Sequence, residues 1–287
     1  MTVGRTIVTW GRLVKFSHSV FALPFALSGA TLAASRHGIT PGKVLWIVVA
    51  MIGARNAAMG FNRLVDQAID ARNPRTATRE LPAGALSRVS VWMATLALTG
   101  IFLLACFMLN PLCLAISPVA IVVIFGYSFT KRFTWGSHLV LGLALAIAPV
   151  GGWVAVAGTF DPIAWLLAAA VLFWVAGFDT VYACQDVEFD RASGLHSIPA
   201  RFGLAGALNL ARLFHAAALG LLAAVGVVAG LHPLYWPGMA AIAGLVVWQH
   251  RLLHPEDLSR LGMAFFNANG TISVVYFAVV LVCVWLA

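Results

Sequence analysis

The sequence contains little charge. Only 10% of its 287 residues are charged, and 10 of these are Asp or Glu, whereas charged residues make up about 25% of an ordinary soluble protein. Hydrophobic residues account for 61% of the chain. This composition excludes an ordinary soluble domain and indicates a protein that lies mostly within a lipid bilayer.

Several signatures of other chemistries are also missing. The eight histidines are scattered without an HExxH pattern and the four cysteines form no CxxC pair, so the sequence offers no zinc site. It also lacks a P-loop and a GxGxxG pattern, which argues against a nucleotide ligand. The cysteines fall in apolar stretches, where we expect them to serve in packing.

Long apolar runs are abundant instead. A helix needs about 20 residues to cross a hydrocarbon core of about 30 Å. Because the runs are apolar all round, without the alternation of barrel strands, they predict helices. We therefore expect an all-α, polytopic membrane protein that forms a single domain over residues 1–287. The nine predicted spans are 18–36, 43–61, 90–110, 111–130, 137–158, 162–187, 206–230, 235–252 and 265–286.

The basic residues predict the orientation in the cytoplasmic (inner) membrane. Loops kept in the cytoplasm collect Lys and Arg, and only Arg36 and Lys43 fall on the side opposite the N-terminus. We expect a cytoplasmic N-terminus and, after nine spans, a C-terminus outside. The net charge of +8 then follows from topology and anionic lipid, without a nucleic-acid partner. The leader RTIVTWGRLVKF is expected to lie in the interface, a cleaved signal peptide being the alternative.

The scarce acidic residues gather in two segments, NRLVDQAID at 62–70 and DTVYACQDVEFD at 179–190. Residues spaced by three, four, seven or eleven share one face of a helix. Asn62, Asp66 and Asp70 therefore form a stripe that extends back to Arg55. Near a membrane such a row of carboxylates is costly unless a cation compensates it, so solvated loop charge is the weaker interpretation.

The second segment has the same character. Asp179, Tyr182, Asp186 and Asp190 share one helix face, and the two aspartate pairs have the same spacing. We interpret this as an internal duplication, with pseudo-repeat halves roughly at 1–134 and 135–287. The two stripes would then meet in one site with two acidic walls.

The chemistry of that site follows from its ligand types. Mg²⁺ is usually held by one or two carboxylates together with substrate phosphates. Two facing DxxxD stripes therefore suit a diphosphate bridged by Mg²⁺, and in an apolar setting a lipid diphosphate is the expected substrate. A secondary transporter could also show duplicated halves and acidic residues, but it would place them near the centre of its spans, whereas these lie at the span ends.

These motifs resemble those of a known family. NxxxDxxxD at 62–70, DxxYAxQDxxxD at 179–190 and GYSFTKRF between them are similar to the motifs of the UbiA superfamily of intramembrane aromatic prenyltransferases, over essentially the whole chain. The resemblance implies about nine helices around a central cavity with a cytoplasmic cap. There Mg²⁺ would help to ionise a polyprenyl diphosphate, and the allyl cation would alkylate an aromatic acceptor.

The resemblance also implies roles for matching residues. Arg63 departs from the pattern, since many members have Asp at that position, and this leaves the exact metal ligation open. The carried-over assignments are Asn62, Asp66, Asp70, Asp186 and Asp190 as Mg²⁺ and diphosphate ligands, Asp179 and Tyr182 beside the reacting carbons, Tyr127 and Lys131 as a YxxxK pair, and Lys131 with Arg132 on phosphate.

Further arginines have candidate roles on physical grounds. Arg72, Arg75 and Arg79 could neutralise the diphosphate leaving group, or could simply reflect positive-inside topology. Arg55 lies deeper on the Asp66 face, where an unpaired charge is expensive. We expect it to bind the acceptor carboxylate, the alternative being an ion pair with one of the aspartates.

Within the family the sequence looks most like bacterial 4-hydroxybenzoate polyprenyltransferases of ubiquinone biosynthesis. Part of that subgroup is associated with futalosine-route menaquinone biosynthesis, where the acceptor is 1,4-dihydroxy-6-naphthoate. Other superfamily activities prenylate haem, a chlorophyll precursor or a glycerol phosphate. The sequence does not fix the acceptor, the prenyl length or the oligomeric state.

Overall fold

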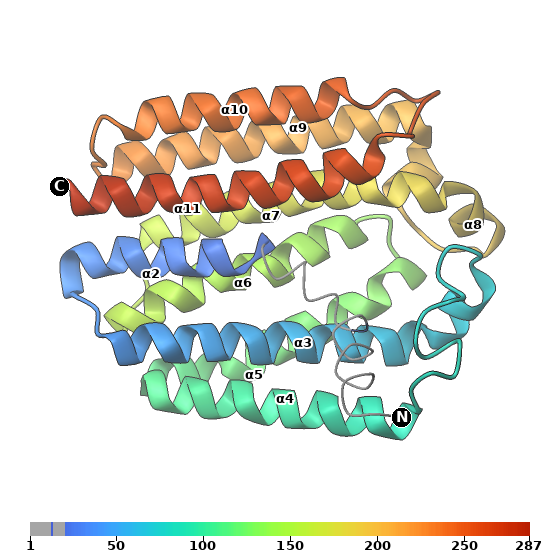
Figure 1. Cartoon of the computed structure of the whole chain (residues 1–287), viewed down its shortest axis with the longest axis horizontal. Coiled ribbons are helices and arrows are strands. Elements are labelled where there is room, and N and C mark those ends of the chain that lie inside the picture. Colours follow the sequence, from blue (N-terminus) through green and yellow to red (C-terminus); the bar gives the residue numbers. More distant parts are fainter. Residues whose placement is uncertain (1–12, 14–20) are drawn as a thin grey trace.

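The computed structural model describes residue 13 and residues 21–287. In this part of the chain the regular elements are all helices, joined by loops (Figure 1). The leader and the first residues of the first predicted span lie outside the described residues. The elements are α2 (Leu23–His37), α3 (Pro41–Arg72), α4 (Arg88–Leu109), α5 (Pro111–Gly126), the 3₁₀ helix η2 (Tyr127–Arg132), α6 (Ser137–Ala157), α7 (Pro162–Ala183), the 3₁₀ helix η3 (Cys184–Asp186), α8 (Val187–Ala192), α9 (Ile198–Val228), α10 (Tyr235–Arg251), the π-helix η4 (Met263–Ala268) and α11 (Asn269–Trp285).

The helices are those of a polytopic membrane protein, as the composition predicted. Within the described residues, six helical stretches are long and apolar enough to cross a bilayer: 41–72, 88–109, 111–132, 137–157, 162–192 and 198–228. The helices α2, α10 and α11 have 15, 17 and 17 residues and run alongside the longer ones (Figure 1). Each predicted span therefore corresponds to a helix.

Three predicted boundaries were wrong. The seventh span was expected to begin at 206, but α9 begins at Ile198 and has a kink at Gly203. The second span was expected to end at residue 61, but α3 continues to Arg72 and carries the whole first motif on its last three turns. The sixth span was expected to continue to 187, but α7 ends at Ala183 because the amide of Cys184 bonds back to Val181, one residue nearer than in an α-helix. The second motif therefore crosses a 3₁₀ turn before α8.

Several helices begin with the same local signal. Thr40, Asn110 and Asp161 each accept a hydrogen bond from a backbone amide of the first turn that they cap, and a proline follows each of them directly. A polar cap satisfies an amide that has no partner within the helix, and proline at the first position has the required φ angle. In these three helices, the polar cap residue and the proline after it thus determine where the helix begins.

The helix α2 packs tightly into the second half of the chain. Gly29 lies against the backbone of Pro149, and Gly152 of α6 lies against the backbone of Ala26, so a side chain at either glycine would collide with the neighbouring helix. Small residues permit such close crossings in membrane proteins. The result is a bundle in which α2 and α6 lie between α9–α11 on one side and α3–α5 on the other (Figure 1).

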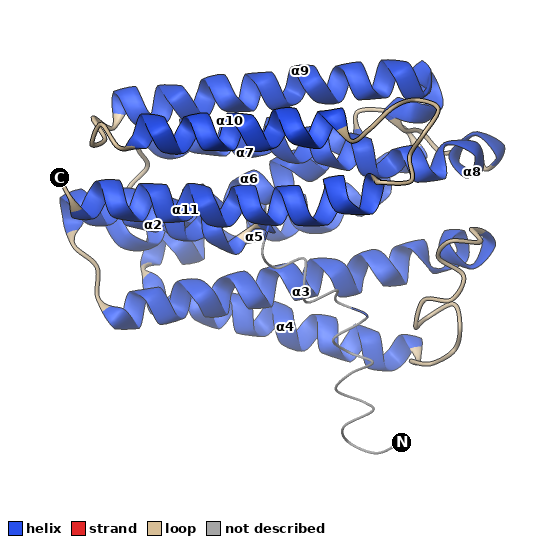
Figure 2. Ribbon diagram, turned by 45° about the horizontal axis from the view of Figure 1, so that its top comes forward, coloured by secondary structure: helices blue, strands red, loops and turns tan. Residues whose placement is uncertain are grey.

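The two ends of the bundle differ. At one end lie α8 and the loop 73–87, which connects α3 to α4 (Figure 2). At the other end the Lys43 Nζ donates a hydrogen bond to the carbonyl of Val156 at 2.9 Å, and Asn110 Nδ2 donates to the carbonyl of Val154 at 2.8 Å. These bonds join α3 and α5 to the last turn of α6.

Candidate active site

A cavity of about 420 Å³ lies between α2–α7. We call its end beside the loop 73–87, where Asn73, Arg75, Thr76 and Arg79 line it, the mouth. Its α3 wall extends from Ile47 to Asp70, which is roughly 35 Å at 1.5 Å per residue. The deep part is apolar and is lined by residues such as Phe102 and Ile116, whereas both acidic motifs lie around the mouth. One continuous space thus connects a charged entrance to an apolar chamber.

The first motif is held by arginines. Asn62 Nδ2 donates to Asp66 Oδ2 at 2.8 Å, and Arg132 donates to Asp66 Oδ1 at 2.8 Å. Arg79, from the loop 73–87, donates to Asp70 Oδ1 at 2.6 Å. The interactions connect α3 to η2 and to the loop, so they position the two carboxylates at the mouth.

The second motif is held in the same way. Arg75 binds Asp186 with two nitrogens, Nε at 2.8 Å and Nη2 at 2.5 Å, and Asn73 Nδ2 donates to the same carboxylate at 3.0 Å. Arg75 also donates to the Tyr182 hydroxyl at 3.0 Å and lies over its ring. The loop after α3 is thereby joined to α7 and η3 across the mouth.

The guanidinium of Arg75 stays protonated in its folded environment. Burial lowers the pKa of its guanidinium, but the hydrogen bond and the negative charge of Asp186, with Tyr182, outweigh burial and raise the pKa above its usual value. A residue so placed is a fixed positive charge beside the mouth. It can bind a carboxylate or an anionic substrate at any ordinary pH.

Among the described residues, two buried carboxylate oxygens have no hydrogen-bond donor. They are Asp70 Oδ2 and Asp190 Oδ2, one from each motif. Within the described part of the chain, their ion-pair partners are Arg63 and Lys131, both at 3.8 Å. Buried anionic oxygens require compensation, so these two fit a divalent cation.

The spacing of the ligands indicates what kind of cation site this is. Among the described residues, no three His, Cys, Asp or Glu side chains lie close enough together to hold a metal ion by themselves. A closed protein cage is therefore absent from this part of the chain. Mg²⁺ does not need one, because it is commonly held by one or two carboxylates plus substrate phosphates.

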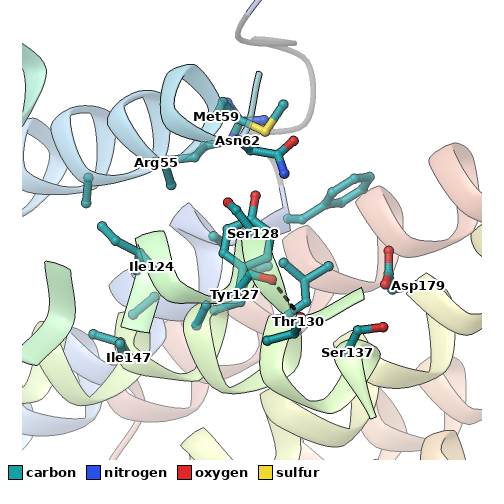
Figure 3. A pocket seen from close by; sticks show the side chains of 18 of the residues that line it. Arg55, Met59, Asn62, Ile124, Tyr127, Ser128, Thr130, Ser137, Ile147 and Asp179 are labelled. Carbon is teal, nitrogen blue, oxygen red and sulfur yellow. Dashed lines mark hydrogen bonds between the residues drawn. The ribbon is translucent and has the colours of Figure 1, made fainter. Parts of the chain in front are cut away.

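The middle of the cavity contains the remaining candidates. Figure 3 shows Arg55, Met59 and Asn62 on one wall and Tyr127 on the facing wall, with Asp179 further along. Arg55 lines the cavity and donates to the Asn56 side chain at 3.2 Å. Arg55 thus lies about two turns deeper than Asn62, where a ligand entering the apolar chamber would pass it.

Two predicted residues lie outside the cavity wall. Arg132 does not line the cavity but pairs with Asp66, as described above. Arg72 is exposed on the last turn of α3 and does not line the cavity. Of the three loop arginines considered from the sequence, the structure therefore brings Arg75 and Arg79 to the mouth and leaves Arg72 outside it.

Several site residues were not foreseen from the sequence. Arg63 is 3% exposed, lines the cavity and lies beside Asp70, so the unusual residue of the first motif faces inward. Asn73 lies three residues after Asp70, and this helical spacing could have identified it. His138, which contacts Asp179, had no such signal, because that contact joins two helices.

Comparisons with known proteins agree with this architecture. Residues 22–271 match the UbiA prenyltransferase family. The 4-hydroxybenzoate octaprenyltransferase of Nitrosospira multiformis is 30% identical over 285 residues, which cover 98% of this chain and 97% of that protein. The 4-hydroxybenzoate solanesyltransferase of Synechocystis is 35% identical over 258 residues, covering 88% and 86%.

Solved structures show the same fold. A UbiA homologue from Aeropyrum pernix superposes with a TM-score of 0.84 at 35% identity, over 92% of this chain and 97% of that one. A UbiA homologue from Archaeoglobus fulgidus, solved with DMAPP and Mg²⁺, has a TM-score of 0.73 at 19% identity, over 97% and 100%. With two carboxylate motifs facing one membrane cavity, the chain belongs to the UbiA prenyltransferase family, and the protein is a prenyltransferase.

Proposed function

We propose that the enzyme transfers a polyprenyl group from a polyprenyl diphosphate to a hydroxylated aromatic acid of the 4-hydroxybenzoate type, for quinone biosynthesis in the cytoplasmic membrane. The observation that carries this proposal is the joining of two carboxylate motifs and their basic partners to one apolar cavity. Relatives over nearly the whole chain bear 4-hydroxybenzoate prenyltransferase names. The charged mouth suits a diphosphate, and the chamber suits a prenyl chain.

The mouth supplies binding and charge neutralisation. Asp66, Asp70, Asp186 and Asp190, with Asn62, would hold Mg²⁺ through one or two carboxylates at a time together with the diphosphate, and the metal would supply electrophilic stabilisation of the leaving group. Arg75, Arg79 and Lys131 each pair with one of these carboxylates at the mouth, and Arg132 pairs with Asp66. Arg75, Arg79 and Lys131 line the cavity and are placed to bind diphosphate oxygens, where positive charge favours cleavage of the C–O bond.

The chamber protects and directs the reactive carbon. When the C–O bond breaks, its electron pair leaves with the diphosphate and a positively charged allyl group forms. Apolar walls exclude water from that group, while the ring of Tyr182 and the carboxylate of Asp179 line the same cavity and can stabilise its charge. A ring carbon of the acceptor then forms the new C–C bond and loses its proton.

Arg55 is the proposed partner of the acceptor carboxylate. It lines the cavity on the deep side of Asn62, and a guanidinium binds a carboxylate with two parallel hydrogen bonds. A 4-hydroxybenzoate held there would present its ring toward the mouth. The naphthoate 1,4-dihydroxy-6-naphthoate carries the same acidic group, so it is the alternative acceptor that the assay must include.

The test is a membrane assay with radiolabelled prenyl diphosphate and Mg²⁺, run with each of the two acceptors. We expect lipid-soluble product with 4-hydroxybenzoate, and loss of at least about 99% of it in Asp66→Asn, a loss common for an essential charged group. Glu256→Gln is the matched control, because Glu256 is exposed on the loop between α10 and α11, away from the cavity. Product with the naphthoate alone would reassign the acceptor, and no Mg²⁺-dependent product with either would overturn the proposal.

A further inference from the structure

Asp179 differs from the other carboxylates of the cavity in its partner. Asp66, Asp70, Asp186 and Asp190 each lie within 4 Å of an arginine or lysine nitrogen. Within the described part of the chain, Asp179 instead pairs with a histidine, His138 of α6. The Nδ1 atom of His138 lies 2.7 Å from Asp179 Oδ2. The charge of Asp179 is therefore not balanced by a fixed cation of this kind.

The protonation of His138 follows from its second contact. The backbone amide of Ile198 donates a hydrogen bond to His138 Nε2 at 3.2 Å. A nitrogen that accepts an N–H bond carries no proton, so the single proton of the neutral ring is on Nδ1 and is donated to Asp179. His138 is thus a neutral hydrogen-bond donor and not a second positive charge.

The positions of His138 and Asp179 relative to the cavity indicate the role of the His138 hydrogen bond. His138 is fully buried, with no exposed surface, whereas 20% of the Asp179 side chain is accessible. Asp179 lines the cavity and His138 does not. The accessible part of the carboxylate therefore faces the cavity (Figure 3), while the imidazole behind it fixes one oxygen.

Both contacts of His138 depend on rigid elements. His138 is the second residue of α6, and Ile198 is the first residue of α9, where amides have no acceptor within the helix. Asp179 is on the last turns of α7. The imidazole thus joins three helices at one point and holds the carboxylate in a single orientation, as outer hydrogen-bond partners do for ligands in active sites.

We propose that His138 is a positioning residue that holds the carboxylate of Asp179 in one orientation, directed into the cavity toward the allylic carbons of the prenyl group. This inference rests on the proposed function. A neutral donor orients the carboxylate without cancelling its charge. An arginine would orient the carboxylate and would also cancel its charge. His138 should accordingly govern turnover and leave diphosphate binding nearly unchanged.

The test uses two substitutions that each preserve one of the two contacts. In His138→Asn the amide nitrogen takes the place of Nδ1 and can donate to Asp179. In His138→Gln the amide reaches the place of Nε2, so its oxygen can accept from Ile198 and the donor to Asp179 is lost. We expect kcat to fall about ten- to a hundredfold in His138→Gln and less than about threefold in His138→Asn, with KM for the prenyl diphosphate unchanged in both.

A second measurement separates positioning from a purely structural role. In an Asp179→Asn background, adding His138→Gln should lower kcat no further, because a residue that acts only through Asp179 has nothing left to position. Thermal unfolding in detergent would be recorded for every variant. Equal losses of kcat in the two His138 variants, or an additive loss on top of Asp179→Asn, would overturn the inference. An inactive wild type would instead overturn the proposed function, and this inference with it.

Discussion

At the scale of single residues, the site contains two kinds of acidic side chain. Four carboxylates are bound to arginine or lysine at the mouth, whereas Asp179 is bound to a neutral imidazole. A carboxylate that shares its charge with a cation can exchange that cation for an anionic substrate or a metal. A carboxylate that is oriented by a neutral hydrogen-bond donor has no cation between it and a positively charged reacting group.

Arg55 gives the first prediction at this scale. Replacing it with Ala should raise KM for the aromatic acid roughly tenfold to a hundredfold, because a hydrogen bond to a charged group contributes about 1.5 to 3 kcal/mol. KM for the prenyl diphosphate should change little, since Arg55 lies on the deep side of the first motif. The measurement is steady-state kinetics with each substrate varied in turn.

The matched control for Arg55 is Arg212→Ala. Arg212 is exposed on α9 and donates to Asn209 of the same helix, so its loss should leave both KM values unchanged. If Arg55→Ala instead weakened both substrates equally, Arg55 would have a general structural role and the acceptor assignment would fail.

The sequence predicted many of these residues because their spacing is local. Asn62, Asp66 and Asp70 share a helix face at any tertiary arrangement, and the structure lines one cavity with them and with the second motif. His138 could not be found in this way. Its importance depends on how α6, α7 and α9 pack, which helical periodicity does not determine.

At the scale of elements, the loop 73–87 connects the two motifs. It begins at the end of α3, sends Arg75 to Asp186 and Arg79 to Asp70, and ends at α4. Its Asn, Pro and Gly residues are typical of a loop, but they do not indicate the direction of its side chains. Three nearby arginines were equivalent in the sequence, and only tertiary contacts distinguish them.

This distinction gives the second prediction. Arg75→Ala should lower kcat/KM for the prenyl diphosphate at least about tenfold, because it removes a charged group from the mouth and leaves Asp186 without its bidentate partner. Arg72→Ala should have an effect of about twofold or less, as surface substitutions usually do. Both variants would be assayed in membranes at saturating acceptor.

The comparison is well matched, since the two arginines are three residues apart and both charges are on the same side of the membrane. A loss as large for Arg72→Ala as for Arg75→Ala would mean that net positive charge on that side, and not the contact with Asp186, controls diphosphate use.

At the scale of the whole molecule, the composition predicted the helical membrane fold, because few soluble folds tolerate so little charge. The spans were found from apolar length alone, and the errors occurred where a helix extends beyond the bilayer, as α3 does, or tightens, as α7 does. The internal duplication stays a prediction.

Orientation in the membrane gives the third prediction. The four native cysteines are buried, so a membrane-impermeant maleimide should label an introduced cysteine selectively. Ser35 is exposed at the end of α2, and Glu256 is exposed on the loop between α10 and α11. With a cytoplasmic N-terminus, Ser35→Cys should be labelled on intact spheroplasts and Glu256→Cys only after lysis. The reverse pattern would invert the assigned topology.

The depth of the cavity has a consequence for the membrane itself. A hollow whose α3 wall runs roughly 35 Å exceeds the hydrocarbon thickness of about 30 Å, so openings at both ends would give protons a path across the bilayer. At the far end, the bonds from Lys43 to Val156 and from Asn110 to Val154 hold α3 and α5 against α6. A cavity of this length has to stay shut at that end while substrates exchange at the mouth, because otherwise the proton gradient across the membrane would be dissipated.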